Sequence, residues 1–114
     1  MPKRDSVRIR HMLDAAREAV AFVQGRPRSD LDHERLLTLG LTRLLEVIGE
    51  ASRRVSPRGR EGHPEIPWLD IGDMRNRLAH GYEDIDLDII WQVLTNELPT
   101  LIRQLEAILS SEEP

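Results

Sequence analysis

One run of the chain, residues 75–82, holds its most concentrated polar functional groups: Arg75-Asn76-Arg77-Leu78-Ala79-His80-Gly81-Tyr82. Arginine binds phosphate through a planar fork of donors, and histidine can give or accept a proton near neutral pH. In RNA the 2′-hydroxyl can attack the neighbouring phosphorus once a base removes its proton, and cations can then stabilise the charge on the phosphate. These residue types therefore suit phosphodiester cleavage, for which no metal ion is strictly needed.

The helix predicted to carry this run complicates that chemistry. At about 100° per residue, His80 lies roughly 140° around the axis from Arg75, whereas Asn76 and His80 share a face. Three solutions stay open: the Arg75 side chain curls, the helix unwinds near Gly81, or the two acting residues come from two chains. We favour the last, a cleft on a dimer axis. A plainer alternative is a solvated helix end with His80 near its negative terminus and Tyr82 merely packing.

Other kinds of site find little support in the sequence. The chain has no cysteine, which excludes disulfides, thiolate zinc sites and cysteine nucleophiles. No two of its four histidines stand four residues apart, so we predict neither a zinc nor a di-iron site, and no cofactor. Glu46 and Glu50 resemble half of a carboxylate metal site, but an ion pair between Glu50 and Arg54 is the simpler interpretation.

The first two predicted helices follow from apolar residues that recur every three or four positions. The first covers residues 6–24, with Asp5 or Ser6 as its cap and Gly25 as a left-handed stop. The second follows Asp32 as its cap, and its seam consists of Leu37, Leu41, Leu44, Ile48, Ala51 and Val55.

The second half of the chain is predicted to begin with a basic loop over residues 56–64, which contain no apolar side chain. A third helix starts at Pro67 and ends near Gly81. Asp86 caps a last helix, which Pro99 kinks or splits. The buried face of the third helix is expected to include Trp68, Leu69, Ile71, Met74 and Leu78.

Together these helices predict an all-α, up-and-down bundle of four to five helices, in which the long second and last helices pair. The 114 residues are enough for a single domain over residues 1–114, and a homodimer is the default for such bundles. We find neither a membrane-length apolar stretch nor an apolar signal core, so a cytoplasmic location is expected.

The spacing of arginine, four residues, histidine, one residue and tyrosine resembles the motif of HEPN-domain ribonucleases (higher eukaryotes and prokaryotes nucleotide-binding). Arg75, His80 and Tyr82 meet that motif here, and Asn76 matches it as well. The flanking sequence resembles the HepT-like toxin branch across nearly the whole chain, at residues 44–51, 63–68 and 86–91.

This resemblance implies an all-helical, HEPN-like dimer that is the toxin of a toxin–antitoxin system, whose antitoxin is an MntA-like minimal nucleotidyltransferase. It implies metal-independent RNA cleavage, with tRNA as a substrate class, in a cleft lined by both protomers. Arg75 would stabilise the scissile phosphate and His80 would act as general base or acid. Asn76 would orient the substrate, and Arg77 is expected to bind it too. Tyr82 would accept AMP from the antitoxin, which would block the cleft and repel a polyanion.

Charge is distributed unevenly along the chain, whose formal net charge is −4. Residues 1–60 carry 13 basic and 8 acidic side chains, and residues 61–114 carry 3 and 12. Asp73 and Glu83 depart from the family pattern and add negative charge beside the expected RNA site. RNA binding therefore needs a local basic surface, for which the candidates are Arg53, Arg54, Arg58, Arg60, Arg75 and Arg77.

Two other hypotheses remain. The first is a non-catalytic helical dimer that keeps the motif but binds nucleotide or a nucleotidyltransferase partner. The second is a purely structural bundle, in which alanine at positions 75, 80 and 82 changes stability alone.

Overall fold

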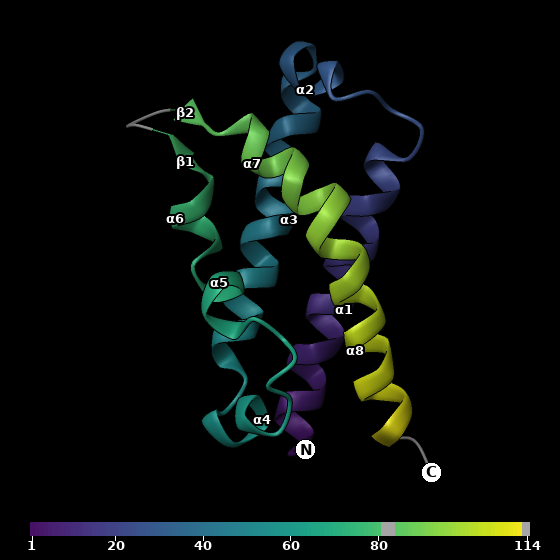
Figure 1. The fold of residues 1–114 in the computed structure, drawn as a ribbon, viewed down its shortest axis with the longest axis vertical. Coiled ribbons are helices and arrows are strands. Elements are labelled where there is room, and N and C mark those ends of the chain that lie inside the picture. The colour runs from purple at the N-terminus through teal and green to yellow at the C-terminus, as the bar shows by residue number, and fades with distance from the viewer. Residues whose placement is uncertain (81–83, 113–114) are drawn as a thin grey trace.

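The chain reverses direction at each end of the molecule, so that its long helices run up and down (Figure 1). The structure is a computed structural model that describes residues 1–80 and 84–112, with His80 described by its backbone. The predicted all-α class is confirmed, since the described residues add only one pair of two-residue strands to the helices. The elements are α1 (Lys3–Val23), α2 (Ser29–His33), α3 (Arg35–Arg54), α4 (Pro57–Glu61), α5 (Trp68–Gly72), α6 (Met74–Leu78), β1 (Ala79–His80), β2 (Asp84–Ile85), α7 (Leu87–Gln92), a π-helical segment η1 (Val93–Glu97) and α8 (Leu98–Glu112).

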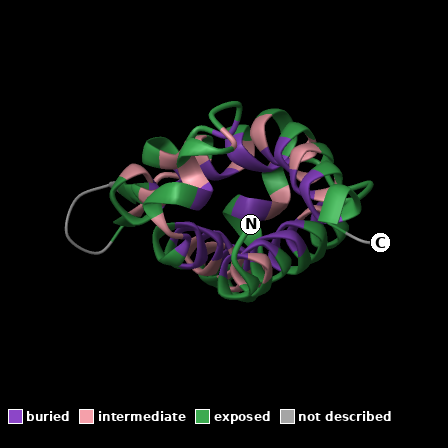
Figure 2. Ribbon diagram, turned by 90° about the horizontal axis from the view of Figure 1, so that it is seen from below, coloured by how far each residue is buried: buried purple, intermediate pink, exposed green. Residues whose placement is uncertain are grey.

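Helix α1 is the main packing partner of both other long helices, α3 and α8. Its inward face carries Ile9, Met12 and Leu13 together with small alanines at positions 16 and 19, all of them buried. Small residues let a helix approach two neighbours closely, and the buried positions of the bundle turn inward (Figure 2). The predicted pairing of the second helix with the last is therefore wrong, because α1 separates α3 from α8.

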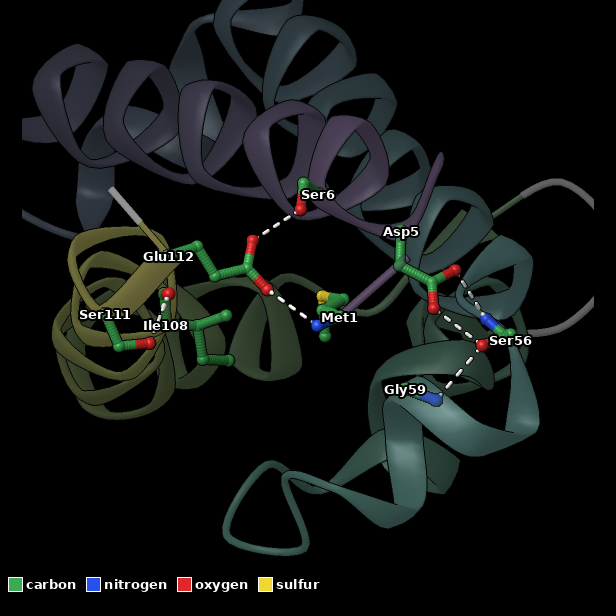
Figure 3. A network of polar contacts seen from close by, with 8 residues as sticks. All are labelled: Met1, Asp5, Ser6, Ser56, Gly59, Ile108, Ser111 and Glu112. Carbon is green, nitrogen blue, oxygen red and sulfur yellow. Dashed lines mark hydrogen bonds and ion pairs between the residues drawn. The ribbon is translucent and has the colours of Figure 1, made fainter. Parts of the chain in front are cut away.

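The segment predicted as a basic loop contains the short helix α4, which α1 holds in place. Asp5 is buried, and its carboxylate accepts hydrogen bonds from the Ser56 backbone N–H at 2.9 Å and from the Ser56 hydroxyl at 2.6 Å (Figure 3). The Ser56 hydroxyl in turn accepts from the Gly59 N–H at 3.0 Å, which caps α4, and Pro57 occupies its first turn. The prediction that Asp5 caps α1 is therefore wrong. Its carboxylate instead binds Ser56, the cap of α4, which lies 51 residues away in the sequence.

The start of the second long helix also differs from its prediction. Gly25 adopts the expected left-handed conformation, with φ of 75°. Asp32, however, lies within the short helix α2, and α3 begins at Arg35. Two arginines stabilise this turn, because Arg26 bonds Asp30 at 3.0 Å and Glu34 at 2.7 Å, while Arg28 bonds Asp32 at 3.2 Å.

The last helical stretch follows its prediction closely. The Asp86 carboxylate caps α7 by accepting from the Ile89 N–H at 3.1 Å. The expected interruption before Pro99 is the π-helical segment η1, in which the Leu98 N–H donates to the Val93 carbonyl, five residues earlier. Proline has no N–H to continue the α-helical hydrogen bonding, and the irregular hydrogen bonds of η1 lie just before Pro99.

Candidate functional site

The single helix predicted from Pro67 to Gly81 is wrong, because the structure divides this segment. Helix α5 ends at Gly72, Asp73 adopts a turn conformation with φ of −90° and ψ of 12°, and α6 ends at Leu78. The backbone is extended at Ala79, with φ of −71° and ψ of 132°. The helix therefore ends two residues before His80.

The His80 backbone lies in β1, where it pairs with Asp84 of β2 in an antiparallel ladder. The Asp86 N–H closes the base of this ladder by donating to the Leu78 carbonyl at 2.8 Å. The angular separation of Arg75 and His80 that was expected for a continuous helix therefore does not hold, because the helix ends between them. Of the three solutions open from the sequence, unwinding of the helix is the one that the backbone adopts, although it occurs before Gly81.

Arg75 and Asn76 line a surface pocket of about 420 Å³ at the junction of four helices. Helix α3 contributes Arg53 and α4 contributes Arg60, although these residues are far from Arg75 in sequence. The remaining lining residues come from α5 and the turn after it: Trp68, Leu69, Gly72 and Asp73. The pocket thus brings together three of the arginines that the sequence offered as a basic surface.

Close packing fixes two of these pocket residues. The aliphatic stem of Arg53 lies over Gly72, so that its Cγ is only 3.0 Å from the position a Cβ would take there. The Trp68 indole N–H donates to the His63 carbonyl at 2.9 Å, and its ring packs against the core. Leu69 was predicted to be buried, but its side chain is 87% exposed because α5 turns it toward solvent.

The three pocket arginines have no carboxylate partner, unlike the five arginines that form ion pairs among the described residues: Arg17, Arg26, Arg28, Arg43 and Arg77. Within the described residues, Arg53, Arg60 and Arg75 make no ion pair, and the buried Nε of Arg60 has no hydrogen-bond partner. Arg17, by contrast, bonds Glu106 at 2.5 Å. Three uncompensated guanidinium groups beside one carboxylate, Asp73, favour an anionic ligand in this pocket.

The two residues predicted to bind substrate take different places. Asn76 lines the pocket, and its amide nitrogen donates to the Asp73 carboxylate at 2.6 Å. This hydrogen bond ties the carboxylate to the residue that follows Arg75 in the chain. Arg77 bonds Glu97 of η1 at 2.5 Å, and this hydrogen bond raises the pKa of the Arg77 guanidinium. Arg77 does not line the pocket, and its ion pair attaches α6 to η1.

The other arginines of the predicted basic surface lie outside this pocket. Arg58 borders a different hollow, together with Met1 and His63. The predicted ion pair between Glu50 and Arg54 does not form. Arg43 bonds Glu50 at 3.2 Å instead and also lies 4.0 Å from Glu46. The two carboxylates that resembled half of a metal site therefore share one arginine.

A second pocket, of about 340 Å³, lies between α5 and the start of α8. Its lining is mostly apolar, contains Ile71, Met74 and Leu101, and includes no arginine or lysine. Two carboxylates line it, Glu65, which lies 3.5 Å from the His63 ring, and Glu97, which pairs with Arg77. This pocket consequently suits a phosphate ligand far less than the one beside Arg75.

Part of the predicted site falls outside this geometry. Tyr82 and Glu83 lie outside the described residues, and nothing is described of the His80 side chain. Among the side chains that are described, no three histidines or carboxylates gather closely enough to hold a metal ion.

Comparison with known proteins adds a family to this geometry. A model of the family described as "Ribonuclease HepT-like" matches residues 12–108. The chain belongs to the HepT-like ribonuclease family. It is 33% identical over 105 residues to a protein named "Putative RNase" from Caldanaerobacter subterraneus subsp. tengcongensis, covering 92% of this chain and 94% of the relative. It is 36% identical over 66 residues to "Probable ribonuclease HepT" from Thermococcus cleftensis, covering 58% and 60%. No solved structure matches the chain.

The family match confirms the resemblance inferred from the motif, and it confirms the HEPN-like helical fold class. Ribonuclease activity is the function that this HepT-like membership supports. In the part of the chain that the structure describes, no helix has both the length and the apolar character of a membrane span.

Sequence reasoning missed Trp68 and Leu69 as residues that line the pocket beside Arg75. One signal was available for Trp68: in the single helix that the sequence predicts, Trp68, Gly72 and Arg75, spaced by four and three residues, would share one face. The convergence of Arg53 and Arg60 on this face had no such signal, because it depends on how α3 and α4 pack against α5.

Proposed function

We propose that this HepT-like chain is the toxin of a two-component system, an endoribonuclease that cleaves RNA, with tRNA as its target, without a metal ion. The observation that carries the proposal is the Arg75 guanidinium, which has no ion-pair partner among the described residues and lies in a pocket with two further arginines in the same state. Arg75 stands four residues before the ladder that holds the His80 backbone. An exposed arginine without a carboxylate partner is available to a phosphate at little cost.

The proposed reaction is an internal transfer of the phosphoryl group. The RNA 2′-oxygen forms a bond to phosphorus while the bond to the 5′-oxygen breaks, leaving a 2′,3′-cyclic phosphate and a 5′-hydroxyl. His80 takes the proton from the 2′-hydroxyl or gives one to the departing 5′-oxygen. Arg75 offsets the negative charge that accumulates on the phosphate oxygens, and Asn76 orients the substrate.

The proposed assembly is a homodimer, because a cleft between two copies supplies arginine and histidine from both. The proposed partner is an MntA-like nucleotidyltransferase antitoxin. In the regulatory step, the Tyr82 hydroxyl oxygen attacks the α-phosphorus of ATP, pyrophosphate leaves, and the hydroxyl proton passes to a base. The AMP group adds bulk and negative charge close to His80, which blocks RNA binding.

Growth after induced expression of the chain alone tests the toxin function. The wild type should arrest growth and lose intact tRNA on a gel, whereas His80→Ala should grow normally with intact tRNA. Equal soluble protein in both strains is the necessary control. Normal growth with intact RNA in the wild type would contradict the proposal and favour a non-catalytic module that binds nucleotide or the nucleotidyltransferase.

The regulatory step makes a separate prediction. Incubation with the nucleotidyltransferase and ATP should raise the intact mass by one or more AMP units, and Tyr82→Phe should abolish the rise because the acceptor oxygen is gone. His80→Ala serves as the control, since it keeps that oxygen and should still be modified. Modification of Tyr82→Phe to the wild-type extent would exclude Tyr82 as the acceptor.

A further inference from the structure

The pocket beside Arg75 has more lining groups than the binding of a single phosphate would require. Its lining includes three arginines, Arg53, Arg60 and Arg75, called here the cationic side, and two apolar residues, Trp68 and Leu69, called here the apolar side. Asp73 is the one carboxylate of the lining. The pocket volume of about 420 Å³ lies within the range of ordinary ligand sites, about 300–1,000 Å³. A nucleotide has the same two parts, a phosphate and an apolar base face.

The cationic side contains a polar group that the protein itself leaves unsatisfied. The Arg60 Nε is buried without a hydrogen-bond partner, although the α4 backbone that carries it is held by Ser56 and Asp5. A buried donor without a partner is costly, but the buried Nε is shielded from a ligand in the pocket. The Arg60 side chain lines the pocket and makes no ion pair among the described residues, so its charge is available to a phosphate. Arg53 makes no ion pair among the described side chains, and its stem is braced on Gly72.

The apolar side combines an exposed leucine with a half-buried tryptophan whose ring is held in place. Leu69 is 87% exposed, so its side chain is accessible to a ligand in the pocket. The hydrogen bond from the Trp68 indole to the His63 carbonyl fixes the ring, so that little side-chain freedom remains to be lost on binding. Bases of single-stranded RNA stack on such aromatic and apolar surfaces.

We propose that this pocket is a nucleotide subsite next to the cleavage point, an inference that rests on the proposed ribonuclease function. Arg53 and Arg60 bind the phosphate adjacent to the one that Arg75 stabilises, and Trp68 and Leu69 contact the base between them. Because apolar contact recognises the face of a base rather than its edge, the subsite selects for an unpaired nucleotide more than for a particular base.

The experiment measures binding of 2′-O-methyl oligouridines, which lack the free 2′-hydroxyl and are not cleaved. In the wild type, extending the probe from a dinucleotide to a tetranucleotide should raise affinity about tenfold, the size of one base contact. The double variant Arg53→Ala/Arg60→Ala should lose most of this gain. The slope of log K against log salt should fall by about 0.7 for each phosphate that the variant no longer binds.

The chain supplies a charge-matched control for each arginine. Arg54 follows Arg53 on α3 and Arg58 shares α4 with Arg60, but neither lines the pocket. The double variant Arg54→Ala/Arg58→Ala removes the same charge and should keep the gain from the longer probe. Leu69→Ser tests the apolar side and should weaken the tetranucleotide several-fold while leaving the dinucleotide unchanged.

The outcomes separate the subsite from the ribonuclease function when tRNA cleavage is measured in parallel. If the pocket and control variants lose affinity equally, the subsite is refuted even where the wild type cleaves tRNA. If the wild type does not cleave tRNA but the pocket variants alone lose the gain, the pocket binds a nucleotide, whereas the ribonuclease proposal and the placement of this pocket next to a cleavage point both fail. Retention of both the gain and the salt slope in Arg53→Ala/Arg60→Ala also overturns the subsite.

Discussion

Alanine in place of Arg75 should lower kcat/KM for tRNA cleavage by about 10²- to 10³-fold, the usual effect of removing one charge-stabilising donor from the transition state. His80→Ala should lower it by about 10²- to 10⁴-fold, because proton transfer at the 2′-hydroxyl or at the leaving oxygen is lost. Both measurements are made on purified protein in EDTA, so that contaminating metal-dependent nucleases are inactive.

The environment of Arg75 makes this test clean. Its side chain is exposed and forms no ion pair with any residue that the structure describes, so alanine there should leave the melting temperature unchanged. Arg75→Lys keeps the charge but loses the planar fork, and it should recover only part of the rate. Arg103, an exposed arginine outside the pocket, bonds only Thr100 among the described residues and serves as the control. Arg103→Ala should cleave within about twofold of the wild type.

Wild-type rates for Arg75→Ala and His80→Ala would refute the catalytic assignment. A loss of rate accompanied by an equal loss of folded protein would instead assign the residue a structural role. Melting curves of every variant distinguish these results.

The parts of the fold that the sequence predicted depend on local rules. Apolar spacing located the long helices, Gly25 supplied a left-handed stop and Asp86 supplied a cap, and each of these needs only residues within one or two turns. The interruption before Pro99 was predictable for the same reason, because proline removes a donor from its own ladder.

The parts that were wrong depend on residues far apart in the sequence. Helix α4 forms where a loop was predicted, because Asp5 of α1 reaches Ser56. The predicted third helix breaks at Asp73, where α5 and α6 each pack against α3. The Arg75 motif could be identified from spacing alone. Arg53 and Arg60 were among six candidate arginines, but the sequence could not select them, since their approach to Arg75 is a consequence of this packing.

The approach of α5 and α6 to α3 depends on Gly49, a buried glycine of α3. A Cβ at this position would lie 2.9 Å from the Ile71 carbonyl oxygen and 3.1 Å from the Met74 Cβ. Backbone and Cβ atoms cannot swing aside as the end of a flexible side chain can, so α5 and α6 must move away from α3. Overpacking of this kind costs about 3 kcal/mol, and alanine's better helix propensity returns about 1 kcal/mol.

Gly49→Ala should therefore lower the free energy of unfolding by about 2 kcal/mol, and the melting temperature by about 8 °C for a chain of this size. Gly40 provides the matched control on the same helix, because a Cβ there meets nothing within 4 Å. Gly40→Ala should instead stabilise the protein by about 1 kcal/mol, since only the helix-propensity gain applies. Thermal and urea unfolding of both variants would show opposite signs, and destabilisation of equal size in both would contradict this account of α3 packing.

The same substitution connects packing with catalysis. Moving α5 and α6 outward carries Arg75 and Trp68 away from Arg53, which stays on α3, so the pocket widens while every one of its residues is still present. Misplacement of a catalytic group by about 1 Å can cost as much as 10²-fold in rate. Gly49→Ala should thus cleave tRNA at least tenfold more slowly at a temperature where its circular dichroism shows it fully folded, whereas Gly40→Ala should cleave at the wild-type rate. Full activity of folded Gly49→Ala would mean that the cleavage site does not depend on the distance between α3 and α6, and the role given to this pocket would then be wrong.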